Sequence, residues 1–237
     1  MDSMINTEQY LKLWDIKINK KQRPQFIFSQ ILKNSRVLEL GCSAGYMSKI
    51  LKEEYGVSVI GVELDPIAAE SAKKYCEEVI VGDLENKLVL DKILVYNNLD
   101  CILMVDLLEH LKDPYSLLIT LTQVLNSKGR IIILIPNIAF WRIRYMLLKG
   151  QFKYDNYGIM DKTHLKFFTF NSIHELVKQA GYKVILHKGE NWDFPFQSKL
   201  SKIPILSHLY KHVIRDILFR MPNIFAKSTL LVAIQNK

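Results

Sequence analysis

The residues with the clearest chemical pattern are the ten that read VLELGCSAGY, residues 37–46. A short apolar run ends here in a turn that contains Gly41, Cys42 and Gly45, and a helical pattern follows at once. The two glycines permit a tight turn and a close approach of the backbone to a ligand. The following helix offers unpaired N–H groups to an anion. The pattern predicts a site for a nucleotide-like ligand, because doubly wound folds bind such ligands at this place.

The charge of this turn narrows the choice of ligand. A dinucleotide site needs the pattern G-x-G-x-x-G, which is absent, and Glu39 would bring a carboxylate close to the phosphates. A ligand with an ammonium, a carboxylate and a ribose but no phosphate fits better. Glu39 would receive the ammonium, and the helix N-terminus the carboxylate. S-adenosylmethionine has these groups, so we expect it as the cofactor.

Two more acidic residues end the next two predicted strands. Glu63 follows Gly41 by 22 residues, about the spacing at which an acid accepts hydrogen bonds from ribose hydroxyls. Asp83 is placed to accept from the exocyclic amine of adenine, with Leu64 and Leu84 as apolar walls. Each acid alone also fits a helix cap or a solvated loop, but both stand at successive strand ends.

A third group, Asp106, Glu109 and His110, follows the fourth predicted strand. Its spacing would place all three side chains on one face of a helical turn. Two carboxylates and an imidazole can hold a divalent metal with open positions, or His110 can act as a general base beside the methyl donor. The alternative is that the acids cap backbone N–H groups and that His110 packs under the sheet edge.

Together these motifs resemble the class I S-adenosylmethionine-dependent methyltransferase family. VLELGCSAG is similar to the first motif of the family, and GVELD and GDLEN to its acidic and post-strand motifs. The resemblance implies cofactor contacts along three strand ends: Glu39, Gly41 and Gly45 at the methionine end, Glu63 at the ribose, and Asp83 with Leu84 at the adenine. Ser43 departs from the family, which most often has glycine there, and it crowds the turn.

Other segments resemble particular branches of that family. Residues 106–110 resemble the acid-x-x-Glu-His motif of ubiquinone-biosynthesis O-methyltransferases, which is associated with divalent metal and catechol-like acceptors. Residues 135–137 and 158–169 resemble methyltransferases of glycan and secondary-metabolite pathways. His164 in the latter segment is a second candidate to take a proton from an acceptor hydroxyl or to orient it. Alternatively, it fixes the loop by bonding to the backbone.

Positioning these residues requires an alternation of strands and helices. Aliphatic runs alternate with helical patterns from residue 36 to residue 135. This order predicts an α/β fold: a doubly wound, Rossmann-like, mostly parallel seven-stranded sheet with helices on both faces. We expect strands at 37–40, 57–62, 79–81, 101–105 and 130–135, and helices at 46–54, 66–76 and 114–125. Asp65-Pro66 and Asp113-Pro114 fit helix starts, and Lys128-Gly129 fits a turn.

We expect a single domain with four parts. These are an N-terminal helical cap (1–35), a cofactor-binding half (36–135), a lid or acceptor insertion (136–170) and a C-terminal region (171–237). In the C-terminal region, the hydrophobic spacing predicts a helix at 171–180, a strand at 182–187, a basic amphipathic helix at 205–219 and a sheet-edge strand at 229–234. The amphipathic helix either packs on the domain or contacts a membrane surface.

The net charge of +8 is unevenly distributed. Residues 1–130 carry −2 and residues 131–237 carry +10, which fits an anionic partner or only a solvated basic face. We expect an O-methyltransferase that modifies a hydroxyl of a small molecule or glycan intermediate. The lack of an Asn/Asp-Pro-Pro-Tyr/Phe motif after the fourth strand is unlike the amino-group nucleic-acid methyltransferases. The alternatives are an RNA methyltransferase and a non-catalytic scaffold at a membrane or partner.

The composition fits a soluble globular protein. The 237 residues are 49% apolar and 24% charged, which excludes disordered and collagen-like chains. Three cysteines are too few and too unpatterned for a disulfide framework, so a reducing compartment is expected. Because no signal-like N-terminus or membrane-length apolar run is seen, we expect a cytoplasmic protein without a membrane span.

Overall fold

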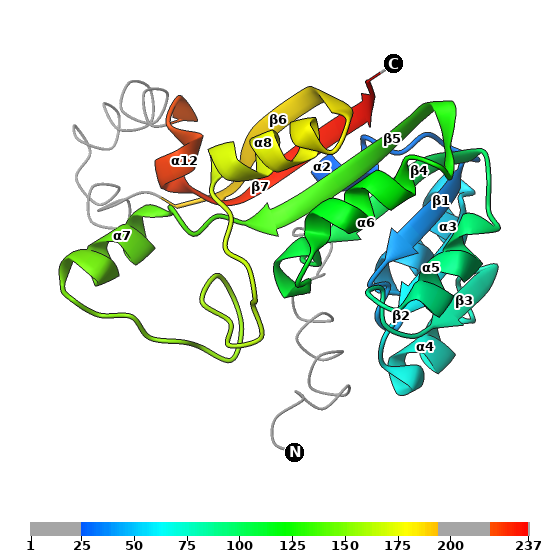
Figure 1. Ribbon diagram of the computed structural model, residues 1–237, viewed down its shortest axis with the longest axis horizontal. Helices are drawn as coiled ribbons and strands as arrows, with labels where there is room; N and C mark the ends of the chain where they lie inside the picture. The colour runs from blue at the N-terminus through cyan, green and yellow to red at the C-terminus, as the bar shows by residue number, and fades with distance from the viewer. Residues whose placement is uncertain (1–24, 194–218, 237) are drawn as a thin grey trace. The chain divides into compact units, whose positions relative to one another are not determined.

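The computed structural model describes residues 25–193 and 219–236. Seven strands in these residues form one mixed sheet, in the order β3-β2-β1-β4-β5-β7-β6 (Figure 1). The predicted α/β fold with a seven-stranded sheet is thereby confirmed. By its internal contacts the chain divides into two compact units, residues 1–104 with 117–132 and residues 105–116 with 133–237.

The first unit contains parallel strands with aliphatic interiors. Their bounds are β1 (Arg36–Leu40), β2 (Ser58–Glu63), β3 (Glu78–Val81) and β4 (Leu99–Val105). β1 lies between β2 and β4, and β3 pairs with β2. Leu38 lies opposite Ile60 on one side and Ile102 on the other, and all three side chains are fully buried. Such runs are typical of parallel strands covered on both faces.

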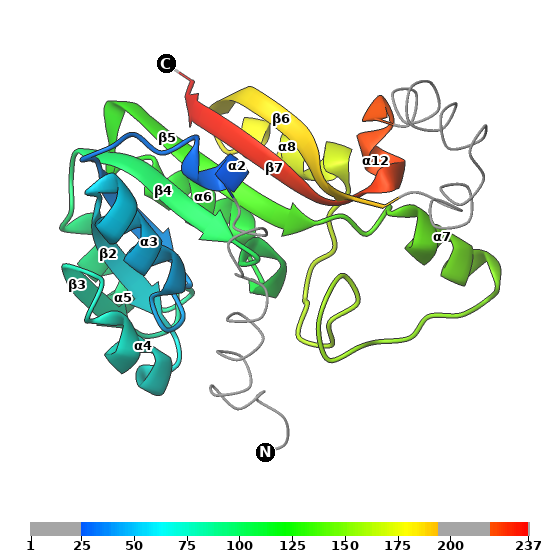
Figure 2. The ribbon, with the colours of Figure 1, turned by 180° about the vertical axis from the view of Figure 1, so that it is seen from behind.

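Helices of the first unit cover both faces of these strands. Their bounds are α2 (Gln25–Phe28), α3 (Tyr46–Tyr55), α4 (Pro66–Ala72) and α5 (Lys87–Leu94). α3 and α5 lie on opposite faces (Figures 1 and 2). Asp65 caps α4 as predicted, since its Oδ1 accepts from the N–H of Ile67 at 2.8 Å. α4 ends at Ala72 rather than at residue 76, and α5, which the sequence analysis did not predict, is capped by Asn86.

The observed strand β5 (Leu125–Pro136) differs from the sequence predictions in two ways. The helix expected at 114–125 is α6 (Pro114–Leu121), which ends earlier. The strand expected at 130–135 already begins at Leu125. Lys128 and Gly129 lie inside β5 and form no turn there. A Cβ at position 129 would lie 2.8 Å from the carbonyl oxygen of Leu99. Glycine therefore serves a close approach of two backbones.

The second unit contains an antiparallel pair, β6 (Tyr182–Trp192) and β7 (Ala226–Gln235). Helix α8 (Phe170–Gln179) packs on both strands and begins with a capping box formed by Thr169 and Ser172. The strand expected at 229–234 is present in β7, but the expected edge position is wrong. β7 lies between β5 and β6. Its successive residues 230–233 are fully buried, which fits an interior strand and not an edge.

The insertion expected at 136–170 contains one helix and a long loop. Helix α7 (Trp141–Leu148) is followed by residues 149–169, which form no helix or strand longer than the bridge between Asp155 and Asp161. The remaining short elements are the 3₁₀ helix η1 (Leu108–His110) and α12 (Pro222–Phe225). That the insertion covers the cofactor turn stays a prediction.

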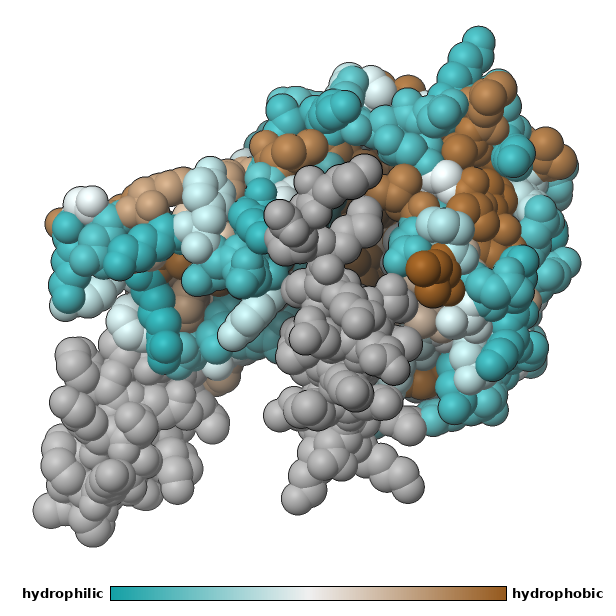
Figure 3. Space-filling model, turned by 90° about the horizontal axis from the view of Figure 1, so that it is seen from below, coloured by the Kyte–Doolittle hydropathy of each residue, from teal (hydrophilic) through white to brown (hydrophobic). Residues whose placement is uncertain are grey.

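Several expectations fall on residues that the structure leaves undescribed. Residues 1–24 of the expected helical cap and all of 205–219 except Phe219 lie outside the described ranges. In 25–193 and 219–236, no helix is long and apolar enough to cross a membrane. Figure 3 shows hydrophobic side chains in brown patches among hydrophilic ones on the face seen from below.

Candidate functional site

The glycine turn between β1 and α3 has the positive backbone angles that its two glycines permit. Gly41 has φ 72° and Gly45 has φ 77°, and Ser43 between them adopts φ 49°. Non-glycine residues rarely take this left-handed conformation, so Ser43 is accommodated at a cost of about 1 kcal/mol. The N–H groups of Gly41 and Cys42 both donate to the carbonyl of Val62. These bonds tie the turn to the end of β2.

Glu63 at the end of β2 holds the turn from the other side. Its Oε2 accepts from the N–H of Ser43 at 2.7 Å, and its Oε1 accepts from the N–H of Asp65 at 2.9 Å. A carboxylate offers about four lone-pair positions. Two positions therefore stay available for ribose hydroxyls, in keeping with the predicted role of Glu63.

Glu39 is more deeply placed than expected. Its side chain is 5% exposed and accepts from the hydroxyl of Ser48 on α3. Burial raises the pKa of Glu39 to about 8, although the bond from Ser48 acts in the opposite direction. The carboxyl group is therefore largely protonated at neutral pH. Its predicted contact with the cofactor ammonium stays a prediction.

The expected adenine residues lie at the surface of the first unit. Asp83 is exposed, and its Oδ1 accepts from the N–H of Glu85 at 2.8 Å. Leu84 is buried, whereas Leu64 is 59% exposed and Ile67 beside it 69%. Exposed leucine and isoleucine next to strand-end carboxylates provide an apolar surface on which a flat ring can pack.

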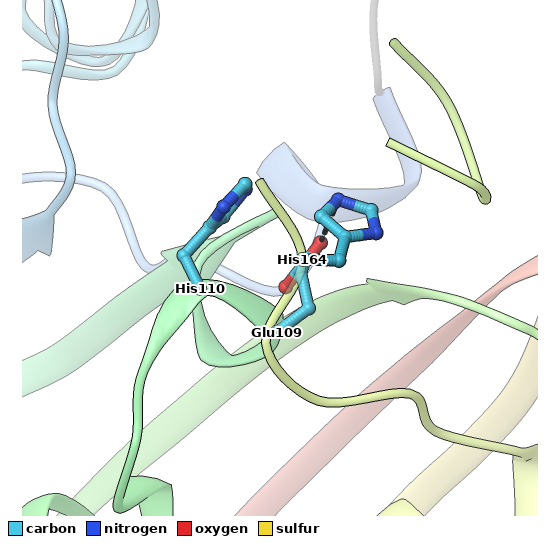
Figure 4. Close-up of side chains that lie close together, drawn as sticks. All are labelled: Glu109, His110 and His164. Atoms are coloured by element: carbon cyan, nitrogen blue, oxygen red, sulfur yellow. Dashed lines mark ion pairs between the residues drawn. The ribbon is translucent and has the colours of Figure 1, made fainter. Parts of the chain in front are cut away.

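A second group of chemically useful side chains lies wholly in the second unit. Glu109 and His110 come from η1, and His164 comes from the loop after α7 (Figure 4). The N–H groups of Leu165 and Lys166 donate to the carbonyl of Glu109 at 2.8 and 2.9 Å. The loop is thus tied to the backbone of η1, which brings together two histidines that lie 54 residues apart in the sequence.

Glu109 has a buried side-chain carboxyl group that few neighbouring donors or positive charges stabilise. Its side chain is 2% exposed, and neither oxygen receives a hydrogen bond from another described residue. Oε1 lies 3.9 Å from Nε2 of His164, and Figure 4 shows the carboxylate pointing toward that imidazole. Burial, with the charge of Asp106 adding to it, raises the pKa of Glu109 well above its usual value.

Both histidines place the same ring nitrogen, Nδ1, against a backbone carbonyl. Nδ1 of His110 lies 3.3 Å from the carbonyl oxygen of Thr163, and Nδ1 of His164 lies 3.2 Å from that of Ile159. A carbonyl only accepts hydrogen bonds, and the hydroxyl of Thr163, also 3.3 Å from Nδ1 of His110, donates to Asp161. This geometry favours a proton on each Nδ1 and a lone pair on each Nε2. Burial lowers the pKa of both rings, which favours this neutral form.

Asp106 does not join this group in the way expected. It has φ 49° and precedes η1, so it does not share a helical face with Glu109 and His110. The left-handed residue turns the chain between β4 and η1. Among the described residues, the ligand-type side chains that lie within 4.8 Å of one another are Glu109, His110 and His164. His164 joins Glu109 and His110 in this group, and the expected role of Asp106 as a metal ligand stays a prediction.

Sequence reasoning missed the residues that support these sites. Ser48 bonds to Glu39, and its signal was a polar residue on the apolar face of a helix. Asp161 fixes the turn before His164, since its Oδ1 accepts from the N–H and the hydroxyl of Thr163 at 2.8 and 2.7 Å. The sequence Asp-x-Thr is typical of such turns and offered a signal.

Comparison with known families places this chain among the methyltransferases. A family model described as methyltransferase domain matches residues 16–187, which is more than two thirds of the chain. The chain belongs to the methyltransferase domain family. It is an S-adenosylmethionine-dependent methyltransferase, so the predicted enzyme class and cofactor are confirmed.

Individual relatives of this methyltransferase are distant. A tRNA U34 carboxymethyltransferase of Aliarcobacter butzleri (strain RM4018) is 26% identical over 129 residues, which cover 52% of this chain and 42% of the relative. The chain thus spans less than half the length of that protein.

Solved structures share the fold of this methyltransferase. An S-adenosylmethionine-dependent methyltransferase from Archaeoglobus fulgidus matches with a TM-score of 0.67 and 17% identity, over 95% of this chain and all of the other. A possible histamine N-methyltransferase from Thermotoga maritima matches with 0.62 and 18%, over 98% and 96%. Phosphoethanolamine N-methyltransferase 2 of Haemonchus contortus, in complex with S-adenosyl-L-methionine, matches with 0.55 and 15%, over 91% and 52%.

Proposed function

We propose that this methyltransferase transfers the methyl group of S-adenosylmethionine to a hydroxyl oxygen of a small molecule or sugar, such as a glycan intermediate. The observation that carries the proposal is the pair of imidazoles of His110 and His164, whose Nδ1 atoms lie 3.3 and 3.2 Å from backbone carbonyl oxygens, an arrangement that favours a lone pair on each Nε2. A hydroxyl needs such a group because it must lose its proton when it is methylated. A carboxylate acceptor would need no general base, because it has no proton to lose.

The reaction is an in-line displacement. A lone pair of the acceptor oxygen forms a bond to the methyl carbon, and the carbon–sulfur bond breaks with its electrons returning to sulfur. The products are a methyl ether, S-adenosylhomocysteine and one proton. The cluster that contains His110 and His164 removes this proton from the acceptor, while the glycine turn and Glu63 hold the cofactor.

The basic second half of the sequence supports an acceptor that carries phosphate. Residues 131–237 have a net charge of +10, and lysines and arginines favour anionic ligands. The three described cysteines are free and buried, which supports a reducing, cytoplasmic location.

A test of this proposal compares His110→Gln and His164→Gln with the matched control His174→Gln. Radiolabelled methyl transfer is measured against hydroxylated sugars, their phosphates, catechols and total tRNA. We expect kcat to fall about 100-fold or more in the first two variants, since general base catalysis contributes on that order. The Kd for S-adenosylhomocysteine should not change, and the label should resist mild alkali as an ether does. Unchanged kcat in both variants, or an alkali-labile ester, contradicts the proposal.

RNA is the second candidate acceptor. The observation in its favour is the 26% identity to a tRNA-modifying enzyme over 129 residues. Label in tRNA, with affinity that falls steeply with salt concentration, would establish it in place of a small acceptor.

A further inference from the structure

Two cysteines of the first unit lie side by side next to the glycine turn. Cys42 belongs to the turn, and Cys76 lies 34 residues later, between α4 and β3. Their side chains are 2% and 6% exposed, and a hydrogen bond joins the two thiol groups. Neither is part of a disulfide. The proposed methyl transfer uses neither thiol group.

Gly61 on β2 leaves the space in which the two sulfur atoms meet. A Cβ at this position would lie 2.7 Å from Sγ of Cys42 and 3.2 Å from Sγ of Cys76. Both sulfur atoms therefore lie over the same position of a strand that is interior to the sheet. A glycine inside a strand weakens it and marks a place where another group approaches closely. Here the approaching groups are the two thiols.

The neighbours of Cys76 favour its thiolate form. The hydrogen bond with Cys42 lowers the pKa of Cys76, and so does the hydroxyl of Ser48, whose Oγ lies 3.3 Å from Sγ, although burial acts in the opposite direction. The bond to Cys76 and burial raise the pKa of Cys42. The thiolate is the form of cysteine that oxidants attack. The pair therefore consists of a reactive sulfur and a protonated thiol in contact with it.

Cys101 on β4 shows what burial does without such neighbours. Its side chain is 2% exposed, and burial raises its pKa to about 12. A thiol with so high a pKa stays protonated and reacts slowly with oxidants. Similar burial thus gives an inert thiol at Cys101, and the different character of Cys76 comes from Cys42 and Ser48.

We propose that Cys42 and Cys76 form an oxidation-sensitive pair, which closes to a disulfide with hydrogen peroxide and thereby weakens the binding of S-adenosylmethionine. The thiolate of Cys76 attacks one peroxide oxygen, the oxygen–oxygen bond breaks, and hydroxide leaves, so that Cys76 becomes a sulfenic acid. Sγ of Cys42 then attacks this sulfur, and the sulfur–oxygen bond breaks. The hydroxyl leaves as water with the thiol proton of Cys42. The two sulfurs together lose two electrons, and the peroxide is reduced to water and hydroxide.

Closing the disulfide must displace the glycine turn. The two sulfurs of a disulfide lie about 2.05 Å apart, which is shorter than any contact between sulfurs that are not bonded. The N–H of Cys42 donates to Val62, its carbonyl accepts from Gly45, and the next N–H, that of Ser43, donates to Glu63. A shift of Cys42 therefore strains the bonds that hold the turn. This effect on binding rests on the proposed function, which places the cofactor at the turn, whereas the disulfide does not.

The experiment treats reduced full-length protein with hydrogen peroxide. The remaining thiols are blocked with iodoacetamide, and mass spectrometry of the proteolytic peptides identifies the disulfide. Calorimetry measures the Kd for S-adenosylhomocysteine before peroxide, after it, and again after dithiothreitol. We expect a cross-link between Cys42 and Cys76. The Kd should rise about tenfold or more, the effect of losing one hydrogen bond to a charged group, and dithiothreitol should restore it.

Variants show whether the pair is responsible for the response. Cys76→Ser, or Cys76→Ala if the serine variant does not fold, should have the same Kd before and after peroxide. Cys101→Ser is the matched control, because it removes another buried thiol, and it should respond as the unchanged protein does. No cross-link, or one that involves Cys101, overturns the pair, and a cross-link with unchanged Kd overturns its effect on the cofactor. Reduced protein that methylates no hydroxyl contradicts only the proposed function, since the cross-link is read by mass.

Discussion

At the scale of single residues, three glutamates with the same side chain are placed in three different states. Glu63 is held by two backbone N–H donors, Glu39 is buried against one hydroxyl, and Glu109 is buried without a hydrogen-bond partner among the described residues. The first is suited to accept further bonds from a ligand. The other two have a raised pKa because burial disfavours the charge.

The raised pKa of Glu39 predicts a pH-dependent loss of stability. The carboxyl group ionises near pH 4.5 when unfolded and near pH 8 when folded, so the folded state binds the extra proton between these values. Its stabilising contribution is complete below pH 4.5 and is lost as the pH rises through 8. Between about pH 5 and 8 the free energy of unfolding should fall by about 1.4 kcal/mol per pH unit relative to Glu39→Gln. Urea unfolding at several pH values checks this, and parallel curves for the two proteins would contradict it.

At the scale of elements, short-range geometry between a strand and the next helix builds the glycine turn. β1 ends at Leu40, the chain turns through residues 41–45, and α3 begins at Tyr46. Gly45 is needed for two reasons: its φ is 77°, and a Cβ there would lie 2.8 Å from Cα of Ala72. The turn therefore packs on the end of α4 as well as bonding to β2.

Gly45→Ala should separate these two requirements when compared with Gly150→Ala. Gly150 has a similar φ of 67°, but a Cβ there would meet nothing within 4 Å. Strain alone costs about 1–2 kcal/mol, so Gly150→Ala should lower the free energy of unfolding by that amount. Gly45→Ala should cost about 1–3 kcal/mol more, because overpacking adds to the strain. Equal losses in chemical denaturation would show that the contact with Ala72 is unimportant.

At the scale of the whole molecule, each of the two units carries one group of candidate site residues. The first contains the glycine turn with Glu63 and Asp83, and the second contains Glu109 with both histidines. Ligand binding to the first group should be measurable without the second.

S-adenosylhomocysteine should therefore stabilise the whole protein through Glu63. At 100 times Kd a ligand adds about 2.7 kcal/mol to the free energy of unfolding, and thermal melting should shift upward by several degrees. Glu63→Ala should lose most of this shift at the same ligand concentration, because it removes the acceptor of the ribose hydroxyls. The control Glu70→Ala changes an exposed glutamate on α4 that pairs with Lys73, and it should melt as the unchanged protein does. An equal shift in Glu63→Ala would refute its role.

The sequence by itself determined the features that depend on residues close together in the chain. The alternation of strands and helices, the glycine turn and the cap at Asp65 follow from local backbone preferences and hydrophobic spacing, and the structure has them. The family resemblance also held over most of the chain. Local patterns were misleading where a strand was mistaken for a turn, as at Gly129, because its close approach to Leu99 comes from a distant segment.

Only the tertiary structure decided the position of β7 in the sheet and the partners of Glu109. Strand order depends on which buried strands pair over long range, and residues 229–234 carry no local sign of a neighbour. His164 lies 54 residues after His110, and two backbone hydrogen bonds to Glu109 bring its loop to η1. Asp106, although near in sequence, has a left-handed backbone and precedes η1, so it does not share a helical turn with Glu109 and His110. Spacing in the chain predicts neighbours only while the backbone stays regular.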